Sequence, residues 1–284
     1  MRAAHVFTYT LGKSLYISLT SRCNSLTLPQ TRGVNFALPN SVIASLLNVR
    51  QAEIQHSDDA VANIDEYSHI QFEGKSLLPP KDDSSWKNDL VGGIDSMLHD
   101  TPIPEFPSTN VLFKEVKHHL ELCTDDIEEI VFAGEGEPTL RMKTLESLAS
   151  QIYQYMKQGT SNEMNNTIIP MRIITNGLVL CKHPEGNDIL HRLLSSGVRT
   201  LSIALMTSSP QQYNKLMQPC IGIKSSQEDT YIHTLLCELV QNAVRVGFNV
   251  ELTGVDHEYV DKRLASELAV SLGASSFRFR PYFP

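Results

Sequence analysis

The sequence lacks any closely spaced pair of cysteines. None of its five cysteines stands in a CxxC or CxxxC pattern, so their spacing predicts neither a zinc site nor an iron–sulfur site. Their number is odd and no secretory signal is evident, so we expect reduced thiols inside a cell rather than disulfides. The five are Cys23, Cys123, Cys181, Cys220 and Cys237.

Long hydrophobic runs and an excess of positive charge are also missing. No apolar stretch approaches the ~18 residues that a membrane-spanning helix needs. The net charge of −8 and the isoelectric point of about 5.7 argue against a general nucleic-acid binder. At 284 residues, 41% hydrophobic and 20% charged, the chain has the composition of an ordinary globular protein with a sizeable core.

Acidic residues are absent from the first 52 positions, since the first one is Glu53. Organellar transit peptides share this bias. The alternating stretch 15–20, LYISLT, is instead typical of a core strand. We therefore expect a cytoplasmic protein, with organellar targeting as the open alternative.

The most distinctive stretch present is 130–141, IVFAGEGEPTLR. Its apolar run predicts a buried strand, the glycines and the proline predict a turn, and a helix-like pattern follows. The turn carries two carboxylates, Glu135 and Glu137. Glu137 would lie at the carboxyl end of the strand, which is where parallel α/β folds keep their chemistry.

Strand-like and helix-like stretches alternate along most of the chain. Parallel pairing with right-handed crossovers follows from this order, and strands at both ends of the pattern favour a partial (βα)6 TIM-like barrel of the α/β class. A doubly wound sheet is the alternative. We expect one domain over 1–284, interrupted after the first βα unit by an irregular insertion at about 56–107. The expected strands are 15–20, 130–133, 168–175, 200–205, 249–256 and 276–283.

Several stretches, in this order, are similar to one known family. They are 9–23 (YTLGKSLYISLTSRC), 134–141 (GEGEPTLR), 175–178 (TNGL), 201–205 (LSIAL), 213–216 (YNKL), 250–253 (VELT) and 277–282 (FRFRPY). Together they resemble the radical S-adenosylmethionine (SAM) superfamily, and within it the TatD-associated radical SAM proteins. The resemblance implies a six-stranded partial barrel that binds SAM at the carboxyl rim of its strands. With a [4Fe–4S] cluster, such a barrel cleaves SAM reductively to a 5′-deoxyadenosyl radical.

The resemblance also implies which residues hold SAM. The rim stretch would be Gly134, Glu135, Gly136, Glu137 and Pro138, with the methionyl ammonium held by the last three. Later strand ends would contact the ribose and the carboxylate, and the positions that match are Asn176, Ser202 and Thr253. Each of these three has a structural alternative, as a turn residue, a backbone partner or an ordinary strand residue. Neither the residues nor the resemblance assigns a catalytic residue or a substrate.

The chain departs from the family at its cluster motif, CxxxCxxC, after the first strand. Cys23 fills the first place, but Thr27 and Gln30 stand at the second and third. A neutral hydroxyl and an amide do not replace two thiolates on iron.

Three hypotheses follow from this departure. The chain is a radical SAM enzyme with cluster ligands from elsewhere, or a degenerate SAM- or ligand-binding module without a cluster. The third is an unrelated hydrolase or lyase that uses Glu135 and Glu137 as acid and base.

Overall fold

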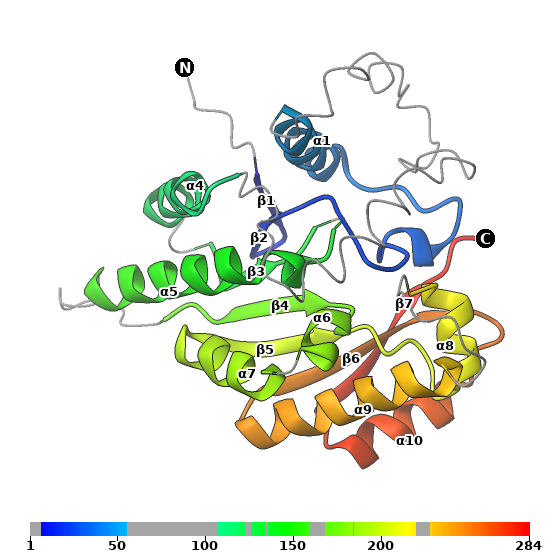
Figure 1. Ribbon diagram of the computed structural model, residues 1–284. Helices are drawn as coiled ribbons and strands as arrows, with labels where there is room; N and C mark the ends of the chain where they lie inside the picture. The colour runs from blue at the N-terminus through cyan, green and yellow to red at the C-terminus, as the bar shows by residue number, and fades with distance from the viewer. Residues whose placement is uncertain are drawn as a thin grey trace.

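A computed structural model describes residues 7–55, 107–122, 126–134, 136–159, 168–183, 185–219 and 228–284. Its centre is a seven-stranded sheet in the order β1 to β7, which curls into a partial barrel (Figure 1). Each of β2 to β6 pairs in parallel with the next strand, so the predicted α/β partial barrel of six parallel strands is confirmed. The strands are β1 Thr8–Leu11, β2 Ser14–Ile17, β3 Glu129–Phe132, β4 Met171–Thr175, β5 Val198–Ile203, β6 Asn249–Asp256 and β7 Ser276–Pro281.

The sequence-based interpretation missed β1, which pairs antiparallel with β2. Only Gly12 and Lys13 separate the two strands, and Gly12 has a φ of 58°. A two-residue hairpin needs such left-handed backbone, which glycine adopts without strain. With four residues and two of them exposed, β1 is too short for its alternation to stand out.

Helices lie between the parallel strands, as expected. Figure 1 shows α5, α7, α9 and α10 along one face of the sheet and α1 on the other side, beside β1 and β2. The short helix α6, directly after β4, was not predicted. The helices are α1 Asn40–Gln55, α4 Thr109–Leu122, α5 Met142–Gly159, α6 Leu178–Lys182, α7 Gly186–Ser195, α8 Pro210–Met217, α9 Glu228–Val246 and α10 Lys262–Leu272.

The two faces of the sheet differ in polarity. Alternate strand residues form the main core against the helices, and they are at most 1% exposed. Each such aliphatic side chain contributes about 1.5–3 kcal/mol by leaving water. They are Leu15, Ile17, Ile130, Phe132, Met171, Ile173, Leu201, Ile203, Val250 and Leu252. The residues between them point to the concave face, which is largely polar from β3 onward.

Near β1 and β2, the concave face is covered by α1. Tyr9 and Tyr16 stack there with ring centroids 5.1 Å apart, and Val42 and Leu46 pack beside them. This small cluster is separate from the main core. It closes one side of the concave face and leaves the part over β3 to β7 to polar groups.

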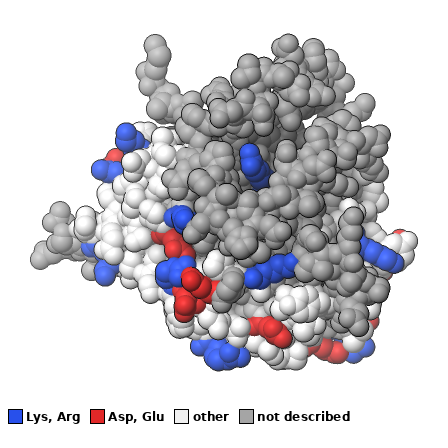
Figure 2. All heavy atoms as spheres, in the orientation of Figure 1, with Lys and Arg blue, Asp and Glu red and all other residues white. Residues whose placement is uncertain are grey.

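The predicted insertion at 56–107 lies outside the described residues, except for Pro107. Figure 2 shows basic and acidic side chains interspersed over the described part of one face. Of the described helices, none has both the length and the apolarity needed to cross a membrane.

Candidate ligand-binding site

The turn after β3 is built by its own sequence. Glu137 has extended backbone and caps a short 3-10 helix, Pro138–Arg141, with Pro138 at its first position. Its side chain accepts a hydrogen bond from the Thr139 amide at 3.1 Å. A side-chain acceptor at the N-cap followed by proline is a favourable way to start a helix. The carboxylate is therefore placed at the carboxyl rim of the sheet, as predicted.

Glu137 is buried, with 3% of its surface exposed. Besides the Thr139 amide, three groups donate to its carboxylate: Thr139 Oγ1 at 2.5 Å, Thr175 Oγ1 at 2.7 Å and the Asn176 amide at 2.7 Å. All four donors are neutral, and no described lysine or arginine forms an ion pair with it. Burial raises the pKa of Glu137, and these hydrogen bonds only oppose the rise.

Asn176 connects the end of β4 to the loop after β2. Its Nδ2 donates to Asn24 Oδ1 at 2.7 Å and to Ser25 Oγ at 3.0 Å, and its Oδ1 accepts from the Leu178 amide at 3.0 Å. The structure thus brings Asn176 beside Glu137 and the loop that holds Cys23. Its amide group is already used in holding these segments together.

The glycines of the turn are explained by close packing of the chain on itself. A Cβ at Gly136 would lie 2.4 Å from the carbonyl oxygen of Thr20 and 2.5 Å from that of Arg22. The Glu137 amide also donates to the Arg22 carbonyl at 2.8 Å. A Cβ at Gly134 would lie 2.9 Å from Ser18 Oγ. The turn after β3 therefore lies directly against the loop after β2. The second carboxylate predicted for this turn, Glu135, is outside the described residues.

Arg141 ends the same stretch and is buried. Its guanidinium donates to the carbonyls of Leu19 at 2.7 Å and Pro107 at 2.9 Å and to Thr144 Oγ1 at 3.1 Å. These bonds tie the end of β2 to the segment that precedes α4. Arg141 thus has a structural role, in holding these segments together, and does not balance the charge of Glu137.

The loop after β2 is closed by the two residues that replace cysteines. The Thr27 amide donates to Gln30 Oε1 at 2.6 Å, and the Gln30 amide donates to Thr27 Oγ1 at 3.4 Å. Reciprocal bonds of this kind, three residues apart, are those of a capping box. Cys23 is half-buried, with its Sγ 3.6 Å from Ser25 Oγ and 3.7 Å from Asn176 Nδ2.

The donor set of the described residues does not fit a [4Fe–4S] cluster. Such a cluster needs three thiolates from the protein when SAM takes the fourth iron, and Cys23 is the only thiol in this loop. Burial raises the pKa of Cys181 to about 12 and that of Cys237 to about 11, so both are neutral thiols. Within the described ranges, no three His, Cys, Asp or Glu side chains are grouped so as to hold a metal. Cys123 and Cys220 lie outside those ranges.

A buried hydroxyl near the rim was missed in the sequence. Tyr213 on α8 is fully buried, and its hydroxyl finds no hydrogen-bond partner among the described residues. Burial raises its pKa, and the neighbouring Cys181, Glu137 and Cys23 raise it further. The hydroxyl is therefore within electrostatic range of the same carboxylate and thiol. No local signal marks it, because a tyrosine on a helix is usually a core residue.

Ser202 and Thr253 belong to a second polar group, on the concave face. Ser202 Oγ donates to Glu251 Oε2 at 2.6 Å, and Thr253 Oγ1 accepts from Arg280 Nη2 at 2.7 Å. Neither is bonded to Glu137 or Asn176. The rim residues and these two strand residues are therefore placed in different polar groups.

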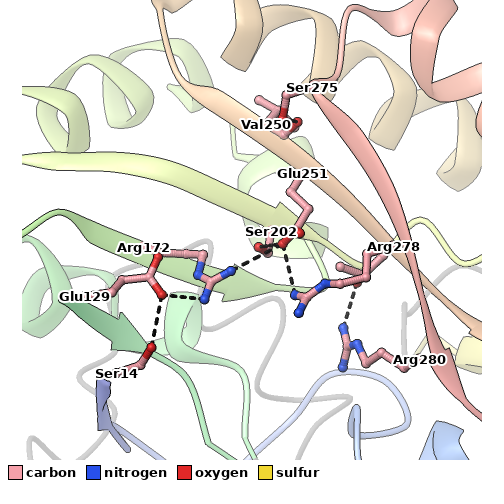
Figure 3. Close-up of polar contacts among 10 residues, drawn as sticks. Ser14, Glu129, Arg172, Ser202, Val250, Glu251, Ser275, Arg278 and Arg280 are labelled. Atoms are coloured by element: carbon pink, nitrogen blue, oxygen red, sulfur yellow. Dashed lines mark hydrogen bonds and ion pairs between the residues drawn. The ribbon is translucent and has the colours of Figure 1, made fainter. Parts of the chain in front are cut away.

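Arginines and glutamates connect the strands of this concave face (Figure 3). Arg172 on β4 bridges Glu129 at 2.5 Å and Glu251 at 3.4 Å, and Arg278 reaches Glu251 at 3.0 Å. The sequence-based interpretation missed this group. Its signal was the alternation of Phe277, Arg278, Phe279 and Arg280, which places every second side chain on one face of the strand.

No protein-family model matches the sequence, and no curated protein matches it. Among solved structures, SuiB from Streptococcus suis bound to the precursor peptide SuiA has 16% identity and a TM-score of 0.43, over 60% of this chain and 33% of SuiB. HydG, a maturase of the [FeFe]-hydrogenase, has 10% identity and a TM-score of 0.42, over 95% of this chain and 42% of HydG.

A third structure is TsrM, a radical SAM methyltransferase from Kitasatospora setae, solved with a tryptophan substrate and a SAM analogue. It has 13% identity and a TM-score of 0.39, over 61% of this chain and 30% of TsrM. The chain spans less than half the length of each of the three. Because one fold hosts many functions, the function is argued below from the residues of this chain.

Proposed function

We propose that this chain binds S-adenosylmethionine at the carboxyl rim of its barrel, without an iron–sulfur cluster in the loop after β2. The observation that carries the proposal is the carboxylate of Glu137, which is buried among four neutral donors and has no cationic partner in the described residues. A buried carboxylate without a counter-charge is costly. The ammonium of a ligand would supply that charge and a charge-assisted hydrogen bond.

The hydroxyl of Tyr213 supports a polar ligand at the same place. A buried hydroxyl without a partner costs free energy, and it persists where a ligand or a water completes its bonding. SAM has hydrogen-bond acceptors in its carboxylate, ribose and adenine. Glu137 would hold the ammonium, and Tyr213 would donate to one of these acceptors.

Three other side chains are assigned more loosely. Asn176, Ser202 and Thr253 stay candidates for SAM: Asn176, beside Glu137, for the carboxylate, and the two strand residues for the ribose. Each is engaged with another side chain, that of Asn24, Glu251 and Arg280 respectively. A role for any of them would require exchange of its present partner.

The loop after β2 supports binding rather than radical chemistry. In the resembled family, the bound cluster supplies the electron that cleaves SAM. Here Thr27 and Gln30 bond to each other, so the loop is closed by the protein itself. We therefore propose the second of the three hypotheses, a ligand-binding module without radical activity.

Calorimetry with two ligands and two proteins tests the assignment of Glu137. The ligands are SAM and 5′-deoxy-5′-methylthioadenosine, which lacks the 3-amino-3-carboxypropyl group and so its ammonium. We expect Glu137→Gln to weaken SAM binding about 10- to 100-fold, the loss of a charged hydrogen bond, and to change binding of the thioadenosine less than about twofold. Equal losses for both ligands would make Glu137 structural only. No binding of SAM to the wild type would overturn the proposal.

Iron and sulfide analysis tests the cluster-free part separately. The protein would be purified under oxygen exclusion and reconstituted with iron and sulfide. We expect no stoichiometric iron–sulfur absorbance, in the wild type and in Cys23→Ser alike. A brown wild-type protein with about four irons per chain, lost in Cys23→Ser, would restore the enzyme hypothesis.

A further inference from the structure

The last strand places two arginines on the concave face of the sheet. In β7, Phe277 packs against the main core, so its neighbours Arg278 and Arg280 point to the opposite side. Figure 3 shows their guanidinium groups on the side that also holds Arg172 and Glu251. The side chain of Arg278 is 50% exposed, so this side is open to solvent.

The arginines of this face are unequally paired. Arg172 lies between two carboxylates, those of Glu129 and Glu251, and is balanced. Arg278 shares Glu251 with Arg172. Arg280 has no carboxylate within ion-pair distance in the described residues, and its one hydrogen bond there goes to the neutral hydroxyl of Thr253.

A third guanidinium, that of Arg32, adds to the positive charge around Arg280. Arg32 donates through Nε to the Pro281 carbonyl at 3.2 Å and lies over the rings of Phe36 and Phe283, at 4.1 and 5.3 Å. Its terminal nitrogens have no hydrogen bond within the described part of the chain. It is held by a carbonyl and by aromatic faces, and it forms no ion pair with a carboxylate of the described residues.

At neutral pH, the charged side chains that influence Arg280 are those of Arg278, Arg32 and Glu251. Burial and the two neighbouring arginines lower the pKa of Arg280 to about 10, and Glu251 and Tyr16 oppose this only in part. It is therefore charged at neutral pH in surroundings that disfavour its charge. An arrangement of this kind gains stability when an anion enters.

We propose that Arg32, Arg278 and Arg280 form an oxyanion site on the concave face, which binds the phosphate or carboxylate group of a small-molecule substrate. The planar guanidinium fork matches both groups in bidentate geometry.

This site is distinct from the proposed SAM position at the rim. Glu137 follows β3, while Arg280 lies on β7, four strands along the sheet, and neighbouring strands are about 4.8 Å apart. The ammonium and the carboxylate of an amino acid share one carbon atom. A ligand whose ammonium meets Glu137 therefore does not bring its own carboxylate to Arg280, and the oxyanion belongs to a second molecule.

Anion titrations of the full chain test the site, with inorganic phosphate and succinate as probes at constant ionic strength. The variant is Arg280→Gln, and the matched control is Arg263→Gln, which removes the same charge from α10, where the side chain is 71% exposed. We expect the dissociation constant of the preferred anion to rise about 10-fold or more in Arg280→Gln and to stay within about twofold in Arg263→Gln. No SAM is present, so the result is independent of the proposed function.

Thermal melting gives a second readout. Without an anion, Arg280→Gln should melt above the wild type, because it removes a charge that its neighbours repel. With the preferred anion, the wild type should gain melting temperature and Arg280→Gln should not. Preference for phosphate assigns phosphate esters as the substrate class, and preference for succinate assigns carboxylates. Equal losses in both variants, no saturable binding of either anion, or a lower melting temperature of anion-free Arg280→Gln would each overturn the proposal.

Discussion

Replacement of Glu137 by alanine should destabilise the fold, because this carboxylate joins the ends of β3 and β4. The variant removes the acceptor of four buried donors, on Thr139, Thr175 and Asn176. The two hydroxyls can turn to other acceptors, but the amides of Thr139 and Asn176 cannot. A buried donor left unsatisfied costs about 1–3 kcal/mol, so the two amides cost about 2–6 kcal/mol. The variant also removes a buried charge that has no counter-charge, and this gain offsets part of the cost of the two amides. We therefore expect the free energy of unfolding to fall by about 2–4 kcal/mol.

The loss should depend on pH in a defined direction. Burial raises the pKa of Glu137 above its ordinary value of 4.5, so the folded chain binds a proton more tightly there than the unfolded chain does. The stability that protonated Glu137 contributes is therefore complete below that ordinary value. It is lost as the pH rises through the raised value of the folded state. The cost of Glu137→Ala should thus be largest near pH 4 and smaller near pH 8.

Urea unfolding at a series of pH values measures both effects. The control is Glu128→Ala, which removes a 65% exposed carboxylate that pairs with Lys13 on the surface. We expect this control to cost less than about 1 kcal/mol, since exposed ion pairs contribute little. The reasoning would be refuted if Glu137→Ala cost no more than the control, or if its cost grew as the pH rose.

Gly136→Ala should cost about 1–3 kcal/mol in thermal unfolding, because its Cβ would overlap the backbone of the loop after β2; an unchanged melting temperature would contradict this packing. Thr27→Ala and Gln30→Ala should each cost about 1 kcal/mol, and the double variant less than their sum, since each residue bonds the other. Additive losses would show that the two bonds are independent. Cys181 and Cys237 should react slowly with iodoacetamide at neutral pH, since burial raises their pKa values to about 12 and about 11; rapid labelling of either, mapped by mass spectrometry, would disprove its burial.

Much of the fold could be predicted from local patterns. Strand-like stretches, some alternating and some continuously apolar, predicted the six parallel strands, and the order of strands and helices predicted a partial barrel. Glu137 was placed correctly at the carboxyl rim, because a buried apolar run followed by glycines and a proline has few other conformations. The prediction missed β1 and α6, which have four and five residues and so too short a periodic signal.

The structure places the predicted site residues in two groups. Asn176 lies beside Glu137, while Ser202 and Thr253 lie in the concave group of Glu251 and Arg280. The replacement of two cysteines was plain in the sequence. The hydrogen bonds between Thr27 and Gln30, which stand in place of those cysteines, could not be predicted, because they depend on the turn that the loop adopts.

By itself, the sequence determined which residues alternate, where helices and strands fall, and which cysteines are missing. These properties depend on neighbours a few positions away. Only the tertiary structure decided that a carboxylate at 137 meets an amide at 176, or that the arginine at 32 disfavours the charge of Arg280. Such encounters are set by strand register and by the curl of the sheet, which join positions that no local pattern relates.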